Sequence, residues 1–406
     1  MTERAQSMHP KRGSSPQLLL DLGHRRGHPG HARSGGGTHW GEPRHSPARP
    51  NPGGNRPHIG TGAESPMTSY GLLSLADHLP DPLTGQCVTQ AERFQQIVGS
   101  AVLAEQAGFE RVGIGEHHFG HYILPSPFVL LGAIAGKTQT LRLGTSVTLL
   151  AGLDPVRVAE DLVTLDAVSN GRAELTVARG VEVSTQVAFG IADESELRPR
   201  FEENLRLLLR LLTEEKVTWS GRFRSSLRDV RLEPRPVQRP HPPLWVGGGL
   251  STVSCDLAAE LGLPLSLPSL FCFPEDYLPI LERYRAQMTA ADRADRISVA
   301  YPSHVHVART SQEARERFRP YLENYVRAAS SFRGSQGRPI DYESLLKGPT
   351  LCGSPAEVVD RIGSVNALLG LRHHYLMPDL GGMPARLLQE VMELLGTEVI
   401  PQLCRG

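Results

Sequence analysis

Two adjacent histidines stand in the segment Gly115-Glu116-His117-His118-Phe119, directly after a short apolar run. An imidazole with an ordinary pKa of about 6.5 gains or loses a proton near neutral pH, so this segment can perform acid–base chemistry. Neighbouring side chains of an extended strand point to opposite sides, so the two rings do not converge on one metal ion. The segment therefore favours a single acid–base histidine over a metal site.

Two further segments combine positive charge, glycine and hydroxyl groups. Arg179 is followed by Gly180, which lets the backbone approach a ligand closely. A Gly-Gly-Gly-Leu-Ser-Thr turn that includes Gly248, Gly249 and Ser251 leads into a helical pattern, where free N–H groups favour an anion. The chain has no GxGxxG motif and no P-loop lysine, which disfavours dinucleotide and nucleoside-triphosphate sites. Together these segments predict a site for a mononucleotide-type phosphate.

The elements that must position these residues alternate along the chain from residue 70 onward. Strand-like apolar runs are predicted at residues 70–76, 110–115, 141–150, 172–178, 244–246, 263–267, 298–308 and 372–377. Helical periods are predicted at residues 91–107, 127–137, 156–168, 194–213, 252–261, 274–288, 311–327, 355–369 and 384–395. Strands that alternate with helices indicate parallel pairing with right-handed crossovers.

Eight such units fit a single-domain (β/α)8 barrel better than an open doubly wound sheet, which remains the alternative fold. A barrel places its chemistry at the carboxyl ends of its strands, where His117, Arg179 and the glycine turn stand. His373 and His374 instead open the eighth strand, which favours a structural role for them. Residues 217–243 read as an insertion rich in Arg and Pro, and residues 328–350 as a polar loop.

Composition divides the chain into two regions. Residues 1–66 hold nine Lys or Arg and four Asp or Glu, a net charge of +5, which leaves −5 on the remainder of a chain with zero net charge. This arm has 12 Gly, nine Pro and seven His with no apolar period, so we expect a disordered extension before a barrel at residues 67–406. The slightly acidic body argues against nucleic-acid binding.

The chain has no apolar run of about 18 residues, so we expect no membrane span. Its apolar segment Leu18-Leu19-Leu20 is too short for the core of a signal peptide. The five cysteines are scattered and form no CxxC pair. They indicate reduced thiols, and we expect a cytoplasmic protein.

At this point the motifs support a family resemblance. They are Glu116-His117-His118-Phe119, Pro125-Ser126-Pro127, Leu143-Gly144-Thr145, Asp154-Pro155-Val156-Arg157, Ser169-Asn170-Gly171-Arg172, Ala178-Arg179-Gly180, Phe189-Gly190, Gly353-Ser354-Pro355 and Val399-Ile400-Pro401. In this order the chain resembles the bacterial-luciferase-like flavin-dependent monooxygenases, and most of all the α-subunit type. The resemblance covers about residues 70–403.

The resemblance implies a two-component monooxygenase. Reduced FMN, supplied by a separate NAD(P)H:flavin reductase, reacts with O2 in such enzymes, and a C4a-hydroperoxide transfers one oxygen atom to a small organic substrate. His117 matches the active-site histidine. Arg179 and Arg200 match phosphate-side arginines, and Ser146-Val147 match a non-prolyl cis peptide under the flavin ring. The glycine turn matches the phosphate turn. We also expect a homodimer.

Several departures from the family pattern concern the substrate side. Ala178 stands where luciferase has a reactive cysteine, Glu182 replaces an aromatic residue, and the aldehyde-pocket aromatics are not evident at residues 265–269. Light emission is therefore disfavoured. The polar stretch at residues 328–350 matches the family's mobile lid.

Three alternatives remain open. The first is a deazaflavin (F420)-dependent oxidoreductase of the same fold, which transfers hydride and needs no O2. The second is a non-catalytic flavin-binding subunit, which retention of His117 and Arg179 disfavours. The third is a metal-dependent hydrolase built on the two histidine pairs, which lacks the expected HxH signature.

Overall fold

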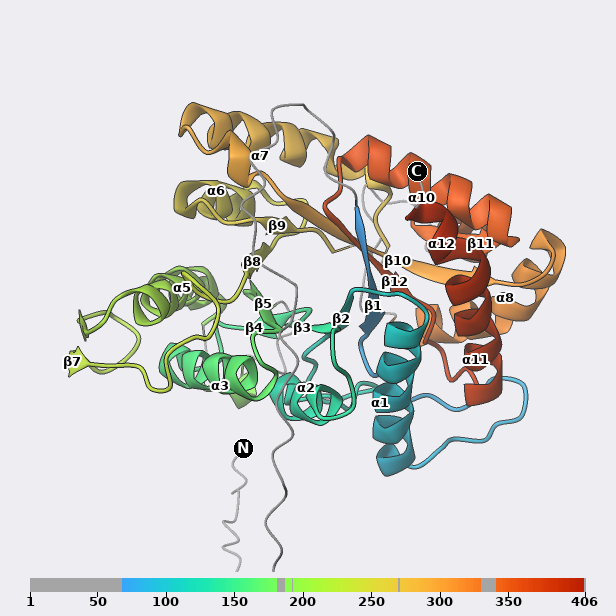
Figure 1. Ribbon diagram of the computed structural model, residues 1–406, viewed down its shortest axis with the longest axis horizontal. Coiled ribbons are helices and arrows are strands. Elements are labelled where there is room, and N and C mark those ends of the chain that lie inside the picture. The colour runs from blue at the N-terminus through green and yellow to red at the C-terminus, as the bar shows by residue number, and fades with distance from the viewer. Residues whose placement is uncertain (1–67, 181–186, 192, 269–270, 330–340, 405–406) are drawn as a thin grey trace, which may run out of the picture. The chain divides into compact units, whose positions relative to one another are not determined.

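The computed structural model describes residues 68–180, 187–191, 193–268, 271–329 and 341–404. A ring of parallel strands forms its centre (Figure 1). The strands of the ring are β1 (Ser69–Ser74), β2 (Arg111–Ile114), β3 (Arg142–Thr145), β5 (Ala173–Ala178), β8 (Leu244–Gly247), β9 (Leu265–Ser266), β10 (Val299–Val307) and β12 (His373–Met377).

The ring is closed because each strand pairs with the next and the last pairs with the first. Strand β12 pairs in parallel with both β1 and β10, and β10 in turn pairs with β9, Val299 lying opposite Leu265. Closure confirms the predicted (β/α)8 barrel and rules out the open sheet. The carboxyl ends of all these strands consequently meet at one face, called the mouth below.

Helices surround the ring in Figure 1. The longer ones are α1 (Gln90–Gln106), α2 (Pro127–Ala135), α3 (Pro155–Val168), α5 (Leu197–Thr213), α6 (Thr252–Leu261), α7 (Leu278–Ala290), α8 (Ser311–Ala328), α10 (Pro355–Leu369) and α11 (Ala385–Leu394). Several begin as their sequences predict: the Asp154 side chain caps α3 with Pro155 at its first position, and Ser354 caps α10 in the same way.

Shorter strands and helices supplement the barrel. They are β4 (Thr148–Leu149), β6 (Val217–Trp219), β7 (Leu227–Val230), β11 (Thr350–Gly353), α9 (Tyr342–Lys347) and α12 (Ile400–Leu403). Strands β6 and β7 form an antiparallel hairpin, and β11 pairs with the end of β10.

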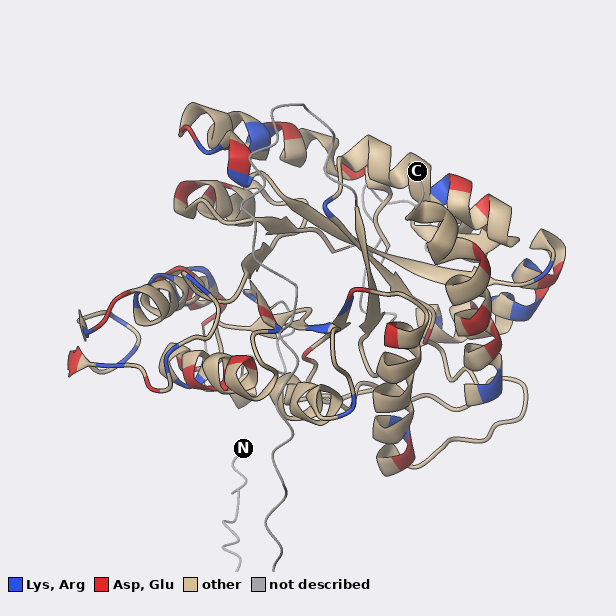
Figure 2. Cartoon of the chain, viewed as in Figure 1, with Lys and Arg blue, Asp and Glu red and all other residues tan. Residues whose placement is uncertain are grey.

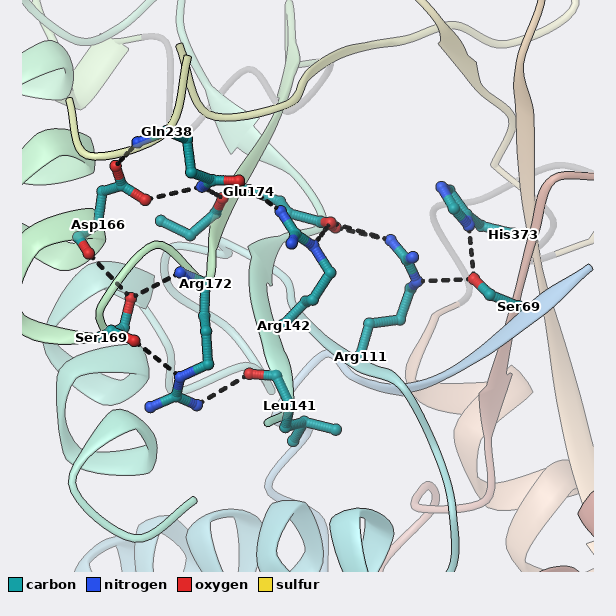
Figure 3. Close-up of polar contacts among 11 residues, drawn as sticks. Ser69, Arg111, Leu141, Arg142, Asp166, Ser169, Arg172, Glu174, Gln238 and His373 are labelled. Atoms are coloured by element: carbon teal, nitrogen blue, oxygen red, sulfur yellow. Dashed lines mark hydrogen bonds and ion pairs between the residues drawn. The ribbon is translucent and has the colours of Figure 1, made fainter. Parts of the chain in front are cut away.

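Charged residues lie mostly on the outer helices and loops, and a few lie on the strands of the barrel (Figure 2). Figure 3 shows Arg111 and Arg142, from neighbouring strands, both directed at Glu174. The Arg111 Nη1 lies 2.8 Å from Glu174 Oε2, and its Nε donates to Ser69 Oγ at 3.0 Å. These side chains converge from β1, β2, β3 and β5, so they mark the inner face of the barrel near its amino end.

Three sequence expectations differ in detail from the structure. The run at residues 141–150 is divided into β3 and β4, because the chain turns at the cis peptide bond Ser146-Val147. The insertion at residues 217–243 contains the β6–β7 hairpin. The polar stretch at residues 328–350 is not one long loop, since Asp341 caps α9 through the backbone N–H of Ser344 and β11 begins at Thr350.

Some expectations fall outside the described residues. These are the disordered extension at residues 1–66, Glu182, and residues 330–340 of the expected lid. Within the described part of the chain, no helix combines the length and the apolar composition that crossing a bilayer requires.

Candidate active site

His117 lies at the mouth, three residues beyond the end of β2. Its backbone N–H donates to the carbonyl of Leu124 at 3.0 Å, and its ring stacks on Tyr122 with centroids 4.2 Å apart. The Nδ1 atom is buried without a hydrogen-bond partner. Burial, with a smaller effect from His118, lowers the pKa of His117 to about 4. The imidazole is therefore neutral at pH 7, and its Nδ1 is not engaged by any described residue.

Glu116 keeps the second histidine of the pair in a different position. Its Oε1 accepts from His118 Nε2 at 2.8 Å, and its Oε2 accepts from the backbone N–H of Leu149 at 3.1 Å. The His118 ring packs edge-on against Phe189, 4.8 Å away. His118 is thus a partnered residue that helps to hold the loops of the mouth together, while His117 has a ring nitrogen free for chemistry.

The turn between β3 and β4 lies beside His117. The Ser146-Val147 peptide bond is cis, as the family resemblance implies. Its carbonyls face β2: Glu116 N donates to Val147 O at 3.0 Å, and a Cβ added to Gly115 would lie 2.9 Å from Ser146 O and 3.5 Å from His117 Cε1. Glycine at position 115 therefore lets this turn approach His117.

The same turn also meets the ends of β5 and β8. A Cβ added to Gly247 would lie 3.1 Å from Ala178 Cβ and 3.2 Å from Val147 Cγ1. Such spacing is tighter than ordinary side-chain contact, so position 247 favours glycine. The predicted histidine, the cis turn and the strand end that carries Arg179 are therefore brought together at one mouth.

Arg179 follows β5 directly and is exposed. No described residue forms an ion pair or hydrogen bond with its guanidinium, whereas the other arginines of this region are paired. Gly180 has a left-handed backbone with φ +83°, which turns the chain away after the arginine. An unpaired guanidinium beside a glycine turn is available to an anionic ligand.

Arg200 has other partners in this structure. Its Nε and Nη2 donate to Glu196 Oε2 at 3.3 and 3.2 Å, and its guanidinium lies 4.8 Å over the ring of Phe223. The structure therefore places Arg200 on the first turn of α5 in a local ion pair, and a phosphate would have to compete with Glu196 for it.

The glycine turn after β8 is partly engaged. The backbone N–H of Gly248 donates to Ser266 O at 2.9 Å, so this N–H is not free for a phosphate. Ser251 caps α6 by accepting from the N–H of Val253. Gly249 lies between them, and a Cβ there would meet only Pro268 at 3.9 Å. The turn leads into a helix start as predicted, with fewer free donors than the sequence suggested.

The second histidine pair lies at the other end of the barrel. His373 bonds to Ser69 Oγ at 2.6 Å, while His374 contacts Ser303 Oγ at 2.9 Å and Asn366 Oδ1 at 2.7 Å. Both open β12, far along the strand from its carboxyl end. Among the described residues, no cluster of three or more His, Cys, Asp or Glu side chains is arranged to hold a metal ion.

Sequence reasoning missed several residues of the mouth. Tyr122 supports the ring of His117, and Tyr325 from α8 reaches Tyr122, with their hydroxyl oxygens 3.2 Å apart. His304 of β10 packs edge-on against Tyr325 at 5.5 Å. Only the position of His304 near a strand end gave a signal, since contacts across 203 residues cannot be read from spacing.

The residues present fit a flavin mononucleotide. An exposed Arg179 that no described residue engages suits a phosphate, and the cis turn packs through Val147 against Gly247 and Ala178 at the strand ends, where a flat ring would rest. His117 offers a neutral nitrogen beside that turn. This fit rests on donors and space that the chain itself provides.

Comparisons with known proteins agree with the fold. Closure of eight parallel strands, with polar residues at their carboxyl ends, places the chain among the (β/α)8 barrels. The family model that matches is described as luciferase-like monooxygenase and covers residues 68–373. The chain belongs to the luciferase-like monooxygenase family.

The individual relatives share limited sequence identity with this chain. Matches to two uncharacterised Sinorhizobium fredii proteins, 35% and 34% identical, cover 39% and 43% of this chain and 45% and 49% of those proteins. The flavin-dependent trigonelline monooxygenase, oxygenase component, of Acinetobacter baylyi is 22% identical over 69% of this chain and 82% of its own length.

Solved structures share the fold. Monooxygenase RslO1 from Streptomyces bottropensis superposes with a TM-score of 0.74 at 27% identity, covering 82% of this chain and 99% of that one. The coenzyme F420-dependent tetrahydromethanopterin reductase of Methanopyrus kandleri has a TM-score of 0.64 at 19% identity, covering 83% and 99%. The likeness to the reductase, at 19% identity, concerns the fold alone.

Proposed function

We propose that this protein is the oxygenase component of a two-component flavin-dependent monooxygenase. It would use reduced FMN and O2 to transfer one oxygen atom to a small organic substrate. The observation that carries the proposal is the convergence of His117, the Ser146-Val147 turn and the exposed Arg179 at one mouth. Family membership and a relative named as an oxygenase component support it.

The residues divide the work by position. Arg179 would bind the phosphate of FMN through charge-assisted hydrogen bonds. The turn at Ser146-Val147 would support the flat ring, and Gly247 would let Val147 of this turn pack closely against β5 and β8. The bound flavin would supply the reaction with O2.

His117 would handle the proton of the reaction. Its neutral imidazole can accept a proton at Nδ1, the atom that has no partner, and return it later. Tyr122 would fix the plane of the ring by stacking, and Glu116 would keep His118 from competing for the same position.

Two partners belong to the proposal. A separate NAD(P)H:flavin reductase would supply the reduced flavin, since the sequence has no dinucleotide fingerprint of its own. The homodimer stays a prediction, which light scattering of the purified protein checks.

A cofactor titration tests the proposal. Purified protein is titrated separately with FMN and with coenzyme F420, and absorbance and fluorescence are followed. We expect a saturable change with FMN that is weakened in Arg179→Ala. Saturable binding of F420 without any change on adding FMN would replace the proposal by the deazaflavin-dependent alternative.

A further inference from the structure

His304 lies on the inner face of the barrel at the mouth. In the pairing of β10 with β12, Pro302 lies opposite Tyr375 and His304 opposite Met377. Tyr375 points inward, because a Cβ added to Gly71 would meet both its ring and the Arg111 side chain. Parallel neighbours in register share a face, so His304 stands above Tyr375, one step nearer the carboxyl end.

A chain of contacts joins His304 to His117. The His304 ring lies edge-on to Tyr325, with centroids 5.5 Å apart. The hydroxyl of Tyr325 lies 3.2 Å from that of Tyr122, whose ring stacks on His117 at 4.2 Å. His304 and His117 therefore stand at the two ends of one continuous wall, which we call the His304 wall (His304, Tyr325, Tyr122 and His117).

Neither ring nitrogen of His304 has a hydrogen-bond partner among the described residues, although the residue is only 1% exposed. More than about 90% of buried polar groups in proteins have a partner, and an unmade bond costs about 1–3 kcal/mol. The Oγ1 of Thr350, which lies beside His304 in the pairing of β10 with β11, is also unpartnered. Buried His373 and His374, by contrast, are both bonded.

We propose that His304 binds the oxygen of an uncharged carbonyl or hydroxyl group of the substrate, an inference that rests on the monooxygenase function proposed above. Three polar atoms of these two paired residues have no partner in the described part of the chain: Nδ1 and Nε2 of His304, and Oγ1 of Thr350. A neutral imidazole donates one hydrogen bond and accepts another. The aromatic rings of Tyr325 and Tyr122 give the same wall flat apolar surfaces for an organic ring.

Charge at the wall favours a neutral ligand. Burial lowers the pKa of His304 to about 4 and raises the pKa of Tyr325 well above its usual value. Both groups are therefore uncharged at pH 7 and offer no positive charge to balance a carboxylate. Because His304 and Tyr325 are each 1% exposed, the Tyr325 ring has to move aside when a ligand reaches the imidazole.

His306 provides the matched control. It is equally buried and both its ring nitrogens are unpartnered, but its ring stacks flat on Phe318, with centroids 4.9 Å apart. No contact links it to His117. If the lack of hydrogen-bond partners alone determined ligand binding, substitution of His306 would weaken binding as much as substitution of His304.

The test measures binding of three probes of similar size to the FMN-loaded full chain by calorimetry. The probes are acetophenone, an uncharged ketone; ethylbenzene, which has no oxygen; and benzoate, a carboxylate. We expect the ketone to bind at least about tenfold more tightly than either of the others, since a site built for a hydrogen bond rejects the analogue without it. This comparison needs no variant and so does not depend on any variant folding.

Variants then assign the preference to His304. His304→Phe should lose the tenfold preference for the ketone over ethylbenzene, His304→Gln should restore most of it, and His306→Phe should keep it. The thermal midpoint of His304→Phe should not fall, because the substitution removes unpartnered polar atoms and keeps a ring. Its FMN affinity should be unchanged.

The outcomes separate this inference from the proposed function. Equal ketone binding by the wild type and His304→Phe, tighter binding of the carboxylate, or no ketone binding at all overturns the inference while FMN binding still supports the function. Absence of FMN binding overturns the proposed function first.

Discussion

Arg179 differs from its neighbours because no acidic residue in the described part of the chain forms an ion pair with it. On α5, for example, the exposed Arg198 forms an ion pair at 2.9 Å with Glu202, which lies one turn away. Arg179 instead follows the end of β5 directly, and no described carboxylate is paired with it.

Arg179→Ala is expected to weaken FMN binding by at least about tenfold, because a charge-assisted bond to phosphate contributes roughly 1.5–3 kcal/mol. Fluorescence titration with FMN measures the effect. Arg198→Ala is the control and should bind FMN like the wild type. Unchanged affinity in Arg179→Ala would remove this residue from the phosphate site.

His117→Ala is expected to lower oxygen transfer by about 100-fold or more while FMN still binds, since acid–base groups contribute 10²–10⁴-fold. Product formation is measured with reduced FMN supplied chemically, so that no reductase limits the rate. His118→Ala is the comparison, and it should disturb FMN binding as well, because His118 holds Glu116 and Phe189. Full activity in His117→Ala would contradict the assigned role.

At the scale of elements, one carboxylate joins the strands on the inner face of the barrel near its amino end. Glu174 of β5 accepts hydrogen bonds from Arg111 of β2 and Arg142 of β3. Arg142 also donates to Gln238 at 2.8 Å (Figure 3). Three strands and the segment before β8 are thereby joined. The amino end of a barrel serves stability, whereas its carboxyl end serves chemistry.

Glu174→Gln is expected to destabilise the protein by about 3–5 kcal/mol, because it leaves two arginines facing each other without their counter-charge. Urea unfolding measures the loss, and FMN affinity should stay within about twofold of the wild type. Glu202→Gln, on the exposed pair with Arg198, should cost less than about 1 kcal/mol. Similar losses in both variants would contradict the structural role of Glu174.

The way in which strands and helices form also explains which of them could be predicted from the sequence. Parallel strands buried on both faces read as apolar runs, so all of the ring strands were recognisable, and helix caps such as Asp154-Pro155 were visible. Strand β11 and helix α9 were missed because they are short and lie in a polar context, where their pairing with β10 and their packing decide the structure.

At the site, His117 and Arg179 were predictable from their places at strand ends. The engagement of Gly248 N–H by Ser266 depends on the pairing of β8 with β9, which no local pattern encodes. The ion pair of Arg200 with Glu196 has the spacing of four residues typical of helix pairs, so that signal was available and favoured the local partner. The His304 wall required contacts between elements far apart in the chain.

At the scale of the whole molecule, buried histidines dominate the response to acid. Burial lowers the pKa of His117 and His304 to about 4, of His306 and His374 to about 3, and of His373 to about 2. In the unfolded chain the same groups titrate near 6.5. At pH values between the folded-state pKa of each histidine and about 6.5, the unfolded chain binds protons that the folded protein does not. Asp77 acts in the opposite direction, since burial raises its pKa to about 6.

The free energy of unfolding is therefore expected to be fully present above about pH 6.5 and to fall as the pH drops from 6.5 toward 4. Each histidine contributes up to about 1.4 kcal/mol per pH unit, and Asp77 offsets one of them below about pH 6. Urea midpoints at pH 7.5, 6.0 and 5.0 test this, with His306→Gln expected to show a shallower decline. A midpoint that stays constant from pH 7.5 to 5.0 would contradict the account.

The central claim, that the mouth of this barrel directs reduced flavin toward oxygen transfer, is tested most directly by one stopped-flow measurement. The protein is loaded with FMNH2 under anaerobic conditions and mixed with O2 while the flavin absorbance is recorded. We predict a transient flavin spectrum, distinct from both oxidised and reduced FMN, that decays faster when a substrate is present. Direct conversion of FMNH2 to FMN at the rate seen in free solution would contradict the claim.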